Sequence, residues 1–264
     1  MNMSVKNTVK SLAGRVADAS GLLRRDFRSS MIIVAFHRIN DSMAEDGITC
    51  GSAKFESFCR FFRSHFRVVP LSAQVAASRE GKDMGGTLSI TFDDGYRDNI
   101  EVAAPILRKL GLPATFFVAT GFIGTEYVPF WDRHLTRQPG WMDWNQVRQL
   151  RDQGFDIGAH THRHLDLASE TPEAIRADLA QCRARMRDEV QGASALFAYP
   201  FGGRDNISPA SMQLVREAGF ECCVSCCGGV NAPVTDPFCL NRIGVASWFA
   251  TPHQLGLEIL LRRA

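Results

Sequence analysis

Short apolar runs alternate with longer amphipathic stretches along this chain, and no other feature restricts its fold as strongly. The runs are rich in β-branched and aromatic residues, which is typical of buried strands. Between them, apolar residues recur at helical spacing, as in Phe55, Phe58, Cys59, Phe62 and Phe66. Repeated strand–helix units predict parallel strands joined by helices in a barrel-like α/β fold. The expected strands are 31–36, 68–69, 88–92, 114–119 and 155–159, with a further one after Gly219.

The length of 264 residues suits one barrel-sized domain. We expect this domain to span residues 31–264, with a helical segment of residues 1–30 before it. The chain carries 30 basic and 28 acidic residues, a net charge of +2. Because no large positive field results, no nucleic-acid partner is expected.

Residues 1–30 lack the continuous apolar core of a secretory signal, and no later run approaches membrane-spanning length. The protein is therefore expected in the cytoplasm. An apolar stripe in this segment allows two interpretations: a helix packed on the barrel, or an interfacial helix in peripheral contact with the inner face of the membrane. The stripe consists of Val5, Val9, Leu12, Val16 and Leu23, and the nearby basic residues are Lys6, Lys10, Arg15, Arg24 and Arg25.

The chain has eight cysteines, which we expect to be reduced thiols because no export signal accompanies them. Four of the six residues from Cys222 to Cys227 are cysteines, and Cys223 and Cys226 have the spacing of a metal-binding pair. No second pair with structural-zinc spacing accompanies it. Most of these cysteines are therefore expected to act as small core residues, not as a second metal or redox site.

Two adjacent carboxylates, Asp93 and Asp94, end the expected strand 88–92 just before Gly95. Ligands of parallel α/β folds gather at the carboxyl ends of strands. One of the two aspartates could bind a metal there while the other stays free. The alternative is that one of them merely caps the following helix.

Three histidines, His160, His162 and His164, occur within five residues directly after the expected strand 155–159. If this segment turns helically, His160 and His164 share a face while His162 points elsewhere. Two imidazoles and one carboxylate form a facial site with open positions, suited to Zn²⁺, with Co²⁺, Ni²⁺ or Mn²⁺ as alternatives. A histidine pair at the surface or in the core is the other interpretation.

These residues carry a family resemblance. The segment Thr91-Phe92-Asp93-Asp94-Gly95 resembles the first motif of the polysaccharide deacetylases, the NodB-homology domain of carbohydrate esterase family 4. His160-Thr161-x-x-His164 resembles the second motif, and Phe197-Ala198-Tyr199-Pro200-Phe201-Gly202 resembles the third. The similarity runs from about Met31 to Val245. It implies a distorted (β/α) barrel and metal-dependent removal of N-acetyl groups from N-acetylhexosamine units of a polysaccharide or a lipid-linked saccharide precursor.

The resemblance also implies roles for single residues. Asp94, His160 and His164 would bind the metal, and Asp93 would act as general base. A backbone N–H near Tyr199 would help to stabilise the oxyanion, and the substrate-binding residues would be Tyr199, Pro200, Phe201 and Gly202. Trp131, Trp141 and Trp144 offer flat faces for a sugar, and Trp144 is the candidate chosen for substrate binding. The tryptophans could equally cap the core.

The chain departs from the family pattern in two places. Ala198 stands where the third motif often has an arginine, and Arg242 could supply that guanidinium from a neighbouring strand, unless it is a surface charge. The usual Leu-x-His near the C-terminus is missing, and His253 lacks its context. Instead, Ala35-Phe36-His37-Arg38-Ile39 resembles a segment of exopolysaccharide deacetylases with permuted motifs. His37 is therefore expected to be the general acid, with an ordinary pKa of about 6.5; a histidine that only ends a strand is the alternative.

Three other functions deserve comparison. A related enzyme would remove a formyl or another acyl group from a lipid-linked amino sugar, and an inert relative would only bind carbohydrate. A zinc peptidase is disfavoured, because no glutamate follows His160 as the His-Glu-x-x-His motif requires.

Overall fold

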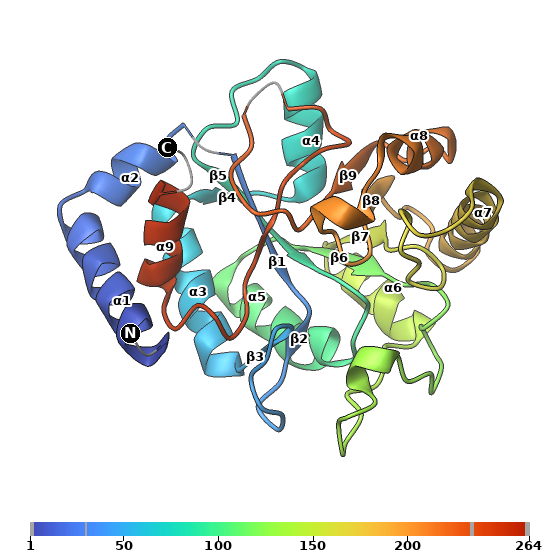
Figure 1. Ribbon diagram of the computed structural model, residues 1–264, viewed down its shortest axis with the longest axis horizontal. Coiled ribbons are helices and arrows are strands. Elements are labelled where there is room, and N and C mark those ends of the chain that lie inside the picture. Colours follow the sequence, from blue (N-terminus) through green and yellow to red (C-terminus); the bar gives the residue numbers. More distant parts are fainter. Residues whose placement is uncertain (1–2, 30, 233–234, 262–264) are drawn as a thin grey trace.

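The computed structural model describes residues 3–29, 31–232 and 235–261, and its parallel strands curve into a distorted barrel surrounded by helices (Figure 1). Strand β5 lies next to β1 in the sheet, and the short β4 pairs with the first residues of β5. The spatial order is β10, β1, β5, β6, β7, β8 and β9. Their bounds are β1 Met31–Phe36, β4 Arg67–Val68, β5 Thr87–Phe92, β6 Thr115–Val118, β7 Asp156–Ala159, β8 Leu196–Ala198, β9 Cys222–Val224 and β10 Ile243–Gly244. The expected distorted (β/α) barrel is confirmed.

The barrel closes through the irregular segment before β10. Leu240 forms a parallel bridge with Val224 of β9, and Ile243 pairs in parallel with Val34 of β1. Residues 240–243 therefore lead from the last strand of the sheet back to the first. A small separate pair, β2 (Arg38–Ile39) and β3 (Thr49–Cys50), extends the chain beyond β1.

Alternate residues of the strands face two different layers of the core, as the two-residue period of a strand requires. Ile32, Val34 and Phe36 of β1 pack with the helices, whereas Met31 and Ile33 belong to a second cluster inside the barrel. The inner cluster also contains Phe117, Leu196 and Val224. The same alternation carried past Ile33 aims Ala35 and His37 toward the inside of the barrel mouth.

Helices cover the outside of the sheet, and phenylalanines fill the layer between them. The rings of Phe36, Phe92 and Phe116 stack along three neighbouring strands, with centroids 5.7 and 4.7 Å apart. The expected stripe of α3 is confirmed, since Phe55, Phe58, Cys59 and Phe62 are fully buried. The helices are α1 Met3–Ala19, α2 Leu22–Phe27, α3 Ser52–His65, α4 Leu71–Arg79, α5 Ala104–Leu110, α6 Trp144–Asp152, α7 Pro172–Glu189, α8 Pro209–Glu217 and α9 Pro252–Leu261. Three single-turn segments are a π-helix, Asn99–Ala103, and two 3₁₀-helices, Phe130–Asp132 and Arg204–Asn206.

Two segments differ from the sequence-based expectations. The helix after the aspartate pair begins as the π-helix Asn99–Ala103, in which Asn99 Nδ2 donates to the His37 carbonyl at 2.7 Å. The segment from His160 to His164 is not a helix but an irregular turn.

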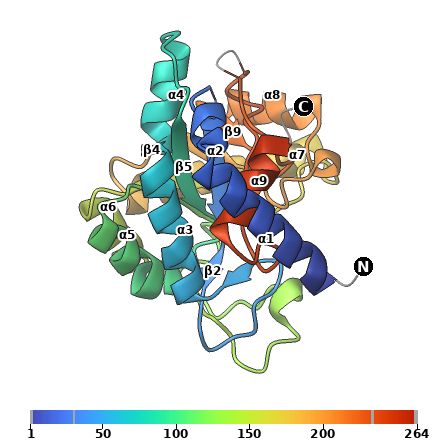
Figure 2. The same ribbon diagram turned by 90° about the vertical axis from the view of Figure 1, so that its left-hand side faces the viewer.

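The N-terminal helices lie against α9 at one edge of the barrel, and Figure 2 shows α1 crossing in front of α9. Asp18 at the end of α1 interacts with His65 of α3 at 2.7 Å and with His253 of α9 at 3.3 Å. The expected boundary at residue 30 falls on a residue outside the described ranges. None of the helices described is both long and apolar enough to cross a membrane.

Candidate metal centre and active site

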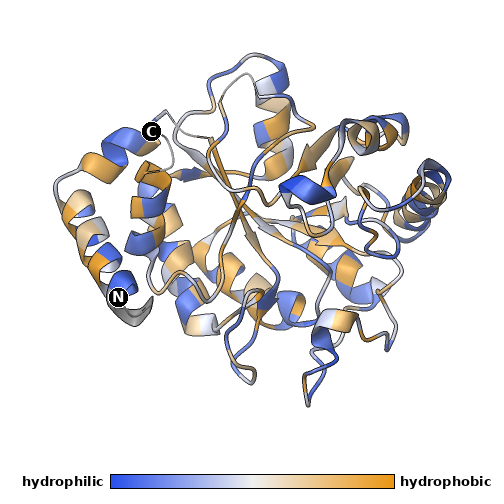
Figure 3. Ribbon diagram, in the orientation of Figure 1, coloured by the Kyte–Doolittle hydropathy of each residue, from blue (hydrophilic) through white to orange (hydrophobic). Residues whose placement is uncertain are grey.

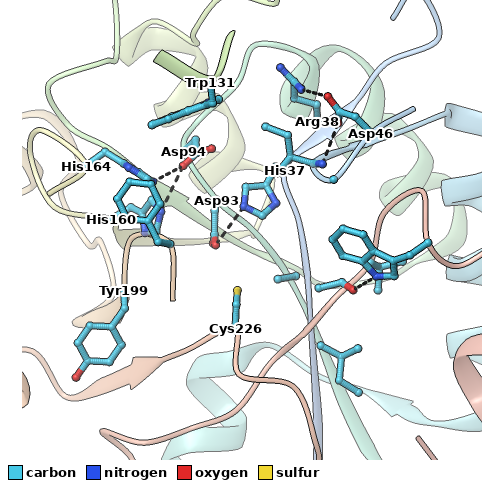
Figure 4. Close-up of a pocket in the computed structure, with 18 of the residues that line it drawn as sticks. His37, Arg38, Asp46, Asp93, Asp94, Trp131, His160, His164, Tyr199 and Cys226 are labelled. Atoms are coloured by element: carbon cyan, nitrogen blue, oxygen red, sulfur yellow. Dashed lines mark hydrogen bonds and ion pairs between the residues drawn. The ribbon is translucent and has the colours of Figure 1, made fainter. Parts of the chain in front are cut away.

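The aspartate pair sits where β5 ends at the barrel mouth. Asp94 has a left-handed backbone, with φ of 75°, and Gly95 follows with φ of 92°. A Cβ at Gly95 would lie 2.7 Å from Cδ1 of Ile123, so only glycine fits this turn without displacement. The turn separates the two carboxylates, because successive side chains leave the strand end in different directions. Asp93 continues the inward-facing series of β5, and Asp94 points toward His160 and His164 (Figure 4).

The histidine turn brings His160 and His164 together by backbone strain instead of helical spacing. Thr161 and His164 have φ of 62° and 56°, which excludes a right-handed helical turn. The buried carboxylate of Asp178 in α7 accepts hydrogen bonds from the backbone N–H of His162 at 2.7 Å and of Arg163 at 3.1 Å. On the other side, Thr120 N donates to the Thr161 carbonyl at 3.1 Å. The expectation that the two histidines share a helix face was therefore wrong in its geometry, although their rings are adjacent, with centroids 4.9 Å apart.

Asp94, His160 and His164 form a compact cluster (Figure 4). Asp94 Oδ1 lies 3.3 Å from Nε2 of each imidazole, and one donor atom from each residue falls within 4.8 Å of the others. His160 Nδ1 donates to the Ala198 carbonyl at 2.8 Å, which leaves the Nε2 lone pair directed at the cluster. Within the described part of the chain, Asp94 Oδ1 is buried without a hydrogen-bond partner. Two imidazoles around an unsatisfied carboxylate oxygen are a donor set that fits a divalent transition ion.

Backbone strain is concentrated at this site. Among the described residues, the non-glycine residues with positive φ are Asp94, Thr161, His164 and Phe201. All four belong to the motifs at the barrel mouth. Such conformations persist only where the surroundings enforce them, and they are common at active sites.

Asp93 is held by a fully buried arginine from another part of the barrel. Arg242 donates from Nη1 to Asp93 Oδ1 at 2.7 Å and from Nη2 to Asp93 Oδ2 at 2.6 Å. Its remaining N–H groups donate to Thr91 Oγ1 at 3.0 Å, to the Ser225 carbonyl at 2.9 Å and to Cys226 Sγ at 3.4 Å. All five guanidinium donors are therefore used. The alternative that Arg242 is a surface charge is therefore wrong, because its side chain is fully buried against Asp93.

The two aspartates are ionised in this environment. Burial alone would raise the pKa of Asp93, but the guanidinium of Arg242 and the nearby His160 outweigh it, and the pKa is lowered. Burial likewise opposes ionisation of Asp94, yet the adjacent imidazoles of His160 and His164 hold the pKa of Asp94 well below its ordinary value. Both carboxylates therefore carry their charge at neutral pH.

His37 faces Asp93 from the end of β1. Its Nε2 lies 3.9 Å from Asp93 Oδ2, on the opposite side of Asp93 from His160 and His164 (Figure 4). Burial lowers the pKa of His37, although the charges of Asp94 and Asp93 oppose that shift. The expected ordinary pKa is therefore corrected downward. His253 lies elsewhere, on α9 against Phe61.

A pocket of about 870 Å³ opens over these residues. Its aromatic wall is made of Phe130, Trp131 and Phe201, and the rings of Trp131 and Phe201 lie 4.7 and 4.8 Å from that of His164. Trp248 lines the pocket as well and is 47% exposed.

The other proposed substrate-binding residues take different positions. Tyr199 lines the pocket, but its N–H donates to the Val224 carbonyl at 3.1 Å and its hydroxyl reaches the Phe238 carbonyl. Its own amide is therefore not free to bind an oxyanion. Pro200 and Gly202 are not among the lining residues. Trp144 lies outside the pocket at the start of α6, packed in the core with Arg185 over its ring, so it offers no face to a sugar.

Sequence reasoning missed several residues that shape the site. Asp178 gave no signal, because its role depends on where α7 lies against the histidine turn. Arg38 forms a buried ion pair with Asp132 and a partly exposed one with Asp46. Tyr96 donates to Asp132 at 2.7 Å and accepts from Trp131 Nε1 at 2.9 Å. This network fixes Trp131 beside His164. The position of Arg38 directly after His37 in the sequence was a signal that could have indicated this network.

The eight cysteines are all free thiols. Cys222 and Cys223 are buried in β9, whereas Cys226 and Cys227 line the pocket. The cysteine cluster is thus divided between the core and the wall of the site.

Comparison with known proteins agrees with this geometry. A model of the polysaccharide deacetylase family matches residues 80–223, more than half of the chain. YxkH of Bacillus subtilis (strain 168), a protein named for the same family, is 22% identical over 231 residues, covering 87% of this chain and 76% of that protein. Poly-beta-1,6-N-acetyl-D-glucosamine N-deacetylase of Escherichia coli (strain K12) is 22% identical over 227 residues, covering 73% of this chain and only 33% of that enzyme.

A solved structure shares the fold. The structure of IcaB from Ammonifex degensii superimposes with a TM-score of 0.72 at 21% identity, covering 89% of this chain and 98% of that one. At this identity the likeness concerns the fold alone.

Replacing Asp178 by alanine is expected to release the histidine turn and to weaken Zn²⁺ binding by about 10–100-fold, as is typical when a residue that positions metal ligands is lost. Isothermal titration with Zn²⁺ measures this change. Glu173→Ala, an exposed acidic residue on the same helix, is the control and should bind Zn²⁺ like the wild type. Equal affinity in Asp178→Ala and the wild type would show that the turn does not need this anchor.

Proposed function

The chain belongs to the polysaccharide deacetylase family, and we propose that it is a metal-dependent hydrolase that removes N-acetyl groups from N-acetylhexosamine units of a polysaccharide or a lipid-linked precursor. One observation carries the proposal. The unsatisfied Asp94 Oδ1 lies between His160 Nε2 and His164 Nε2, directly beside a second carboxylate that Arg242 holds ionised.

The donor set supports a divalent metal, with Zn²⁺ preferred and Co²⁺, Ni²⁺ or Mn²⁺ as alternatives. Asp94, His160 and His164 would hold it. When bound, such a cation polarises a carbonyl oxygen and lowers the pKa of water. The hydrogen bond from His160 Nδ1 to Ala198 fixes the tautomer that this role requires.

Asp93 is the proposed general base. Arg242 orients both of its carboxylate oxygens and keeps the carboxylate charged. Water attacks the acetyl carbonyl carbon and gives a proton to Asp93. The bidentate contact to Arg242 limits rotation of this carboxylate, so its oxygens stay aimed at the pocket.

His37 is the proposed proton donor to the departing amine. Because its pKa is lowered, the imidazole is neutral in the resting protein and must gain a proton during the reaction. Asp93 Oδ2, which lies 3.9 Å from His37 Nε2, can pass to His37 the proton that it took from water. The C–N bond then breaks as His37 protonates the nitrogen, which releases an amine and acetate.

The proposed substrate follows from the pocket and from the relatives. A volume of about 870 Å³ accommodates a sugar unit with its neighbours, and Trp131 and Phe201 offer ring surfaces beside the metal ligands. The name of the E. coli relative supports a β-1,6-linked N-acetylglucosamine substrate. A cytoplasmic location remains a prediction, which fractionation of the native protein would check.

Two alternatives are kept. A deformylase or another deacylase of a lipid-linked amino sugar would use the same residues, and a comparison of formylated with acetylated substrates separates it from a deacetylase. An inert carbohydrate-binding relative is disfavoured, because it would not need the strained cluster or the buried Asp93–Arg242 pair.

The purified protein is expected to release acetate from oligomers of β-1,6-linked N-acetylglucosamine. Acetate release should stop when a chelator removes the metal and should recover when Zn²⁺ is restored.

His164→Ala should lower metal content and abolish turnover, because it removes one of the proposed ligands. Acetate assay and elemental analysis measure the two effects. Full metal occupancy in His164→Ala would reject the ligand assignment.

Replacing Asp93 by asparagine should separate the base from the ligands. The variant is expected to keep its metal while kcat falls by about 10²–10⁴, the range for lost general-base catalysis. Asp94→Asn is the matched control at the adjacent position and should lose the metal as well. An unchanged kcat in Asp93→Asn would exclude its role.

His37→Ala is expected to lose most amidase activity and keep its metal, while His253→Ala, whose imidazole lies on α9, should stay close to the wild type. An aryl acetate should partly restore His37→Ala, because a phenolate leaves without protonation. Steady-state rates with both substrates test this. Similar amidase rates in the wild type and His37→Ala would refute the proposal for His37.

A further inference from the structure

Helix α1 turns its apolar side chains toward solvent. Val9, Leu12 and Val16 are 55%, 64% and 62% exposed, and apolar segments recur along α1 at the edge of the molecule (Figure 3). The helix packs on α9, as one of the two interpretations expected, but these three residues of its apolar stripe do not face the barrel. Of the other two members, Leu23 is buried in α2, and the side chain of Val5 lies outside the described set.

The face of α1 that packs on the protein is small and polar. Asn7 Oδ1 accepts from Gln254 at 3.2 Å, and Ser11 Oγ accepts from Thr251 at 2.9 Å. Lys10 forms an ion pair with Glu258. A Cβ at Gly14 would lie 2.0 Å from the His253 carbonyl oxygen, so the two helices are in close contact there. At 3.6 residues per turn, Val9, Leu12 and Val16 fall on the side of α1 opposite Gly14. The helix thus has the reverse of the amphipathic orientation usual for a surface helix, whose apolar stripe faces the core.

The charges around the exposed stripe have one sign. Within residues 6–28, all of which are described, the exposed charged side chains are Lys6, Arg15, Arg24, Arg25 and Arg28. The two acidic residues of this segment, Asp18 and Asp26, are only partly exposed, and Asp18 interacts with His65 and His253. An outward apolar face whose exposed neighbouring charges are all cations is the pattern of a helix that lies in a membrane interface.

We propose that the outer face of α1, formed by Val9, Leu12 and Val16 with Lys6 and Arg15 beside them, docks on a lipid bilayer that contains anionic lipids. A second copy of this chain is a less suitable occupant, because pairing two such faces would bring like charges together. Anionic headgroups neutralise the same cations, and the apolar side chains enter the boundary between headgroups and acyl chains.

One short segment, residues 248–251, connects the catalytic pocket with the surface beside α1. Trp248 and Phe249 line that pocket. The next two residues, Ala250 and Thr251, line a second hollow together with residues of α1 that include Leu12 and Arg15. A membrane-docked α1 would hold the pocket close to saccharides carried on lipid. This consequence rests on the proposed function, whereas the binding of α1 to lipid does not.

The test is flotation of the full chain with vesicles of phosphatidylcholine containing about one third phosphatidylglycerol, and with vesicles of phosphatidylcholine alone. We expect binding to the anionic vesicles that weakens as salt is raised. The triple variant Val9→Gln/Leu12→Gln/Val16→Gln and the variant Lys6→Gln/Arg15→Gln should each bind at least tenfold more weakly. Lys109→Gln/Arg187→Gln, which removes the same charge from α5 and α7, should bind like the wild type.

Two measurements keep the outcome decisive. Circular dichroism and turnover of a soluble oligosaccharide should be unchanged in all variants, because none of these residues lies in the pocket. Absence of vesicle binding by the wild type, or equal binding by the triple variant, would overturn the proposal. Sedimentation that shows a dimer broken by the triple variant, without vesicle binding, would assign the face to self-association instead. Absence of acetate release would not change the vesicle-binding results, so failure of the docking and failure of the enzymatic proposal are distinguishable.

Discussion

The buried contact between Arg242 and Asp93 is the interaction on which the rest of the site depends. It joins the end of β5 to the segment that closes the barrel, and both side chains are buried, with only Asp93 reaching the pocket. Removing one partner of such a pair typically destabilises a protein by about 3–5 kcal/mol, because the other charge is left uncompensated. Here the pair is stable because every guanidinium donor has an acceptor, including Thr91 and the Ser225 carbonyl. Asp93 therefore stays charged in a place where burial alone would favour its neutral form.

The cluster of Asp94, His160 and His164 depends on strain that the barrel enforces. Left-handed backbone costs roughly 1–2 kcal/mol at a residue with a side chain, and Asp94, Thr161, His164 and Phe201 all adopt it. Hydrogen bonds from neighbouring elements hold these turns, with Asp178 accepting from two consecutive amides of the histidine turn. The result is a carboxylate oxygen placed between two imidazole nitrogens at equal distances of 3.3 Å. Such a placement needs little rearrangement before a cation can bind.

The alternation of strands and helices was enough to predict the barrel and to place Asp93 and His37 at the ends of buried strands. It was not enough for the histidine turn, because the helical spacing of His160 and His164 coincides with a strained turn that depends on α7. The sequence left open whether Arg242 contacts Asp93 or is a surface charge, because the two residues are 149 positions apart. Trp144 was misplaced because aromatic composition cannot distinguish a core tryptophan from one at a pocket. The α1 stripe was recognised correctly, but its direction depends on polar contacts with α9.

The central claim is that Asp94, His160 and His164 bind the metal while Asp93, paired with Arg242, remains outside its coordination sphere. Anomalous diffraction at the zinc edge from crystals of the Zn²⁺-loaded protein tests this most directly. The account predicts one strong peak about 2.0–2.2 Å from Asp94 Oδ1, His160 Nε2 and His164 Nε2, with both Asp93 oxygens still bonded to Arg242. A peak within ligand distance of Asp93, or one that leaves His164 uncoordinated, would contradict it.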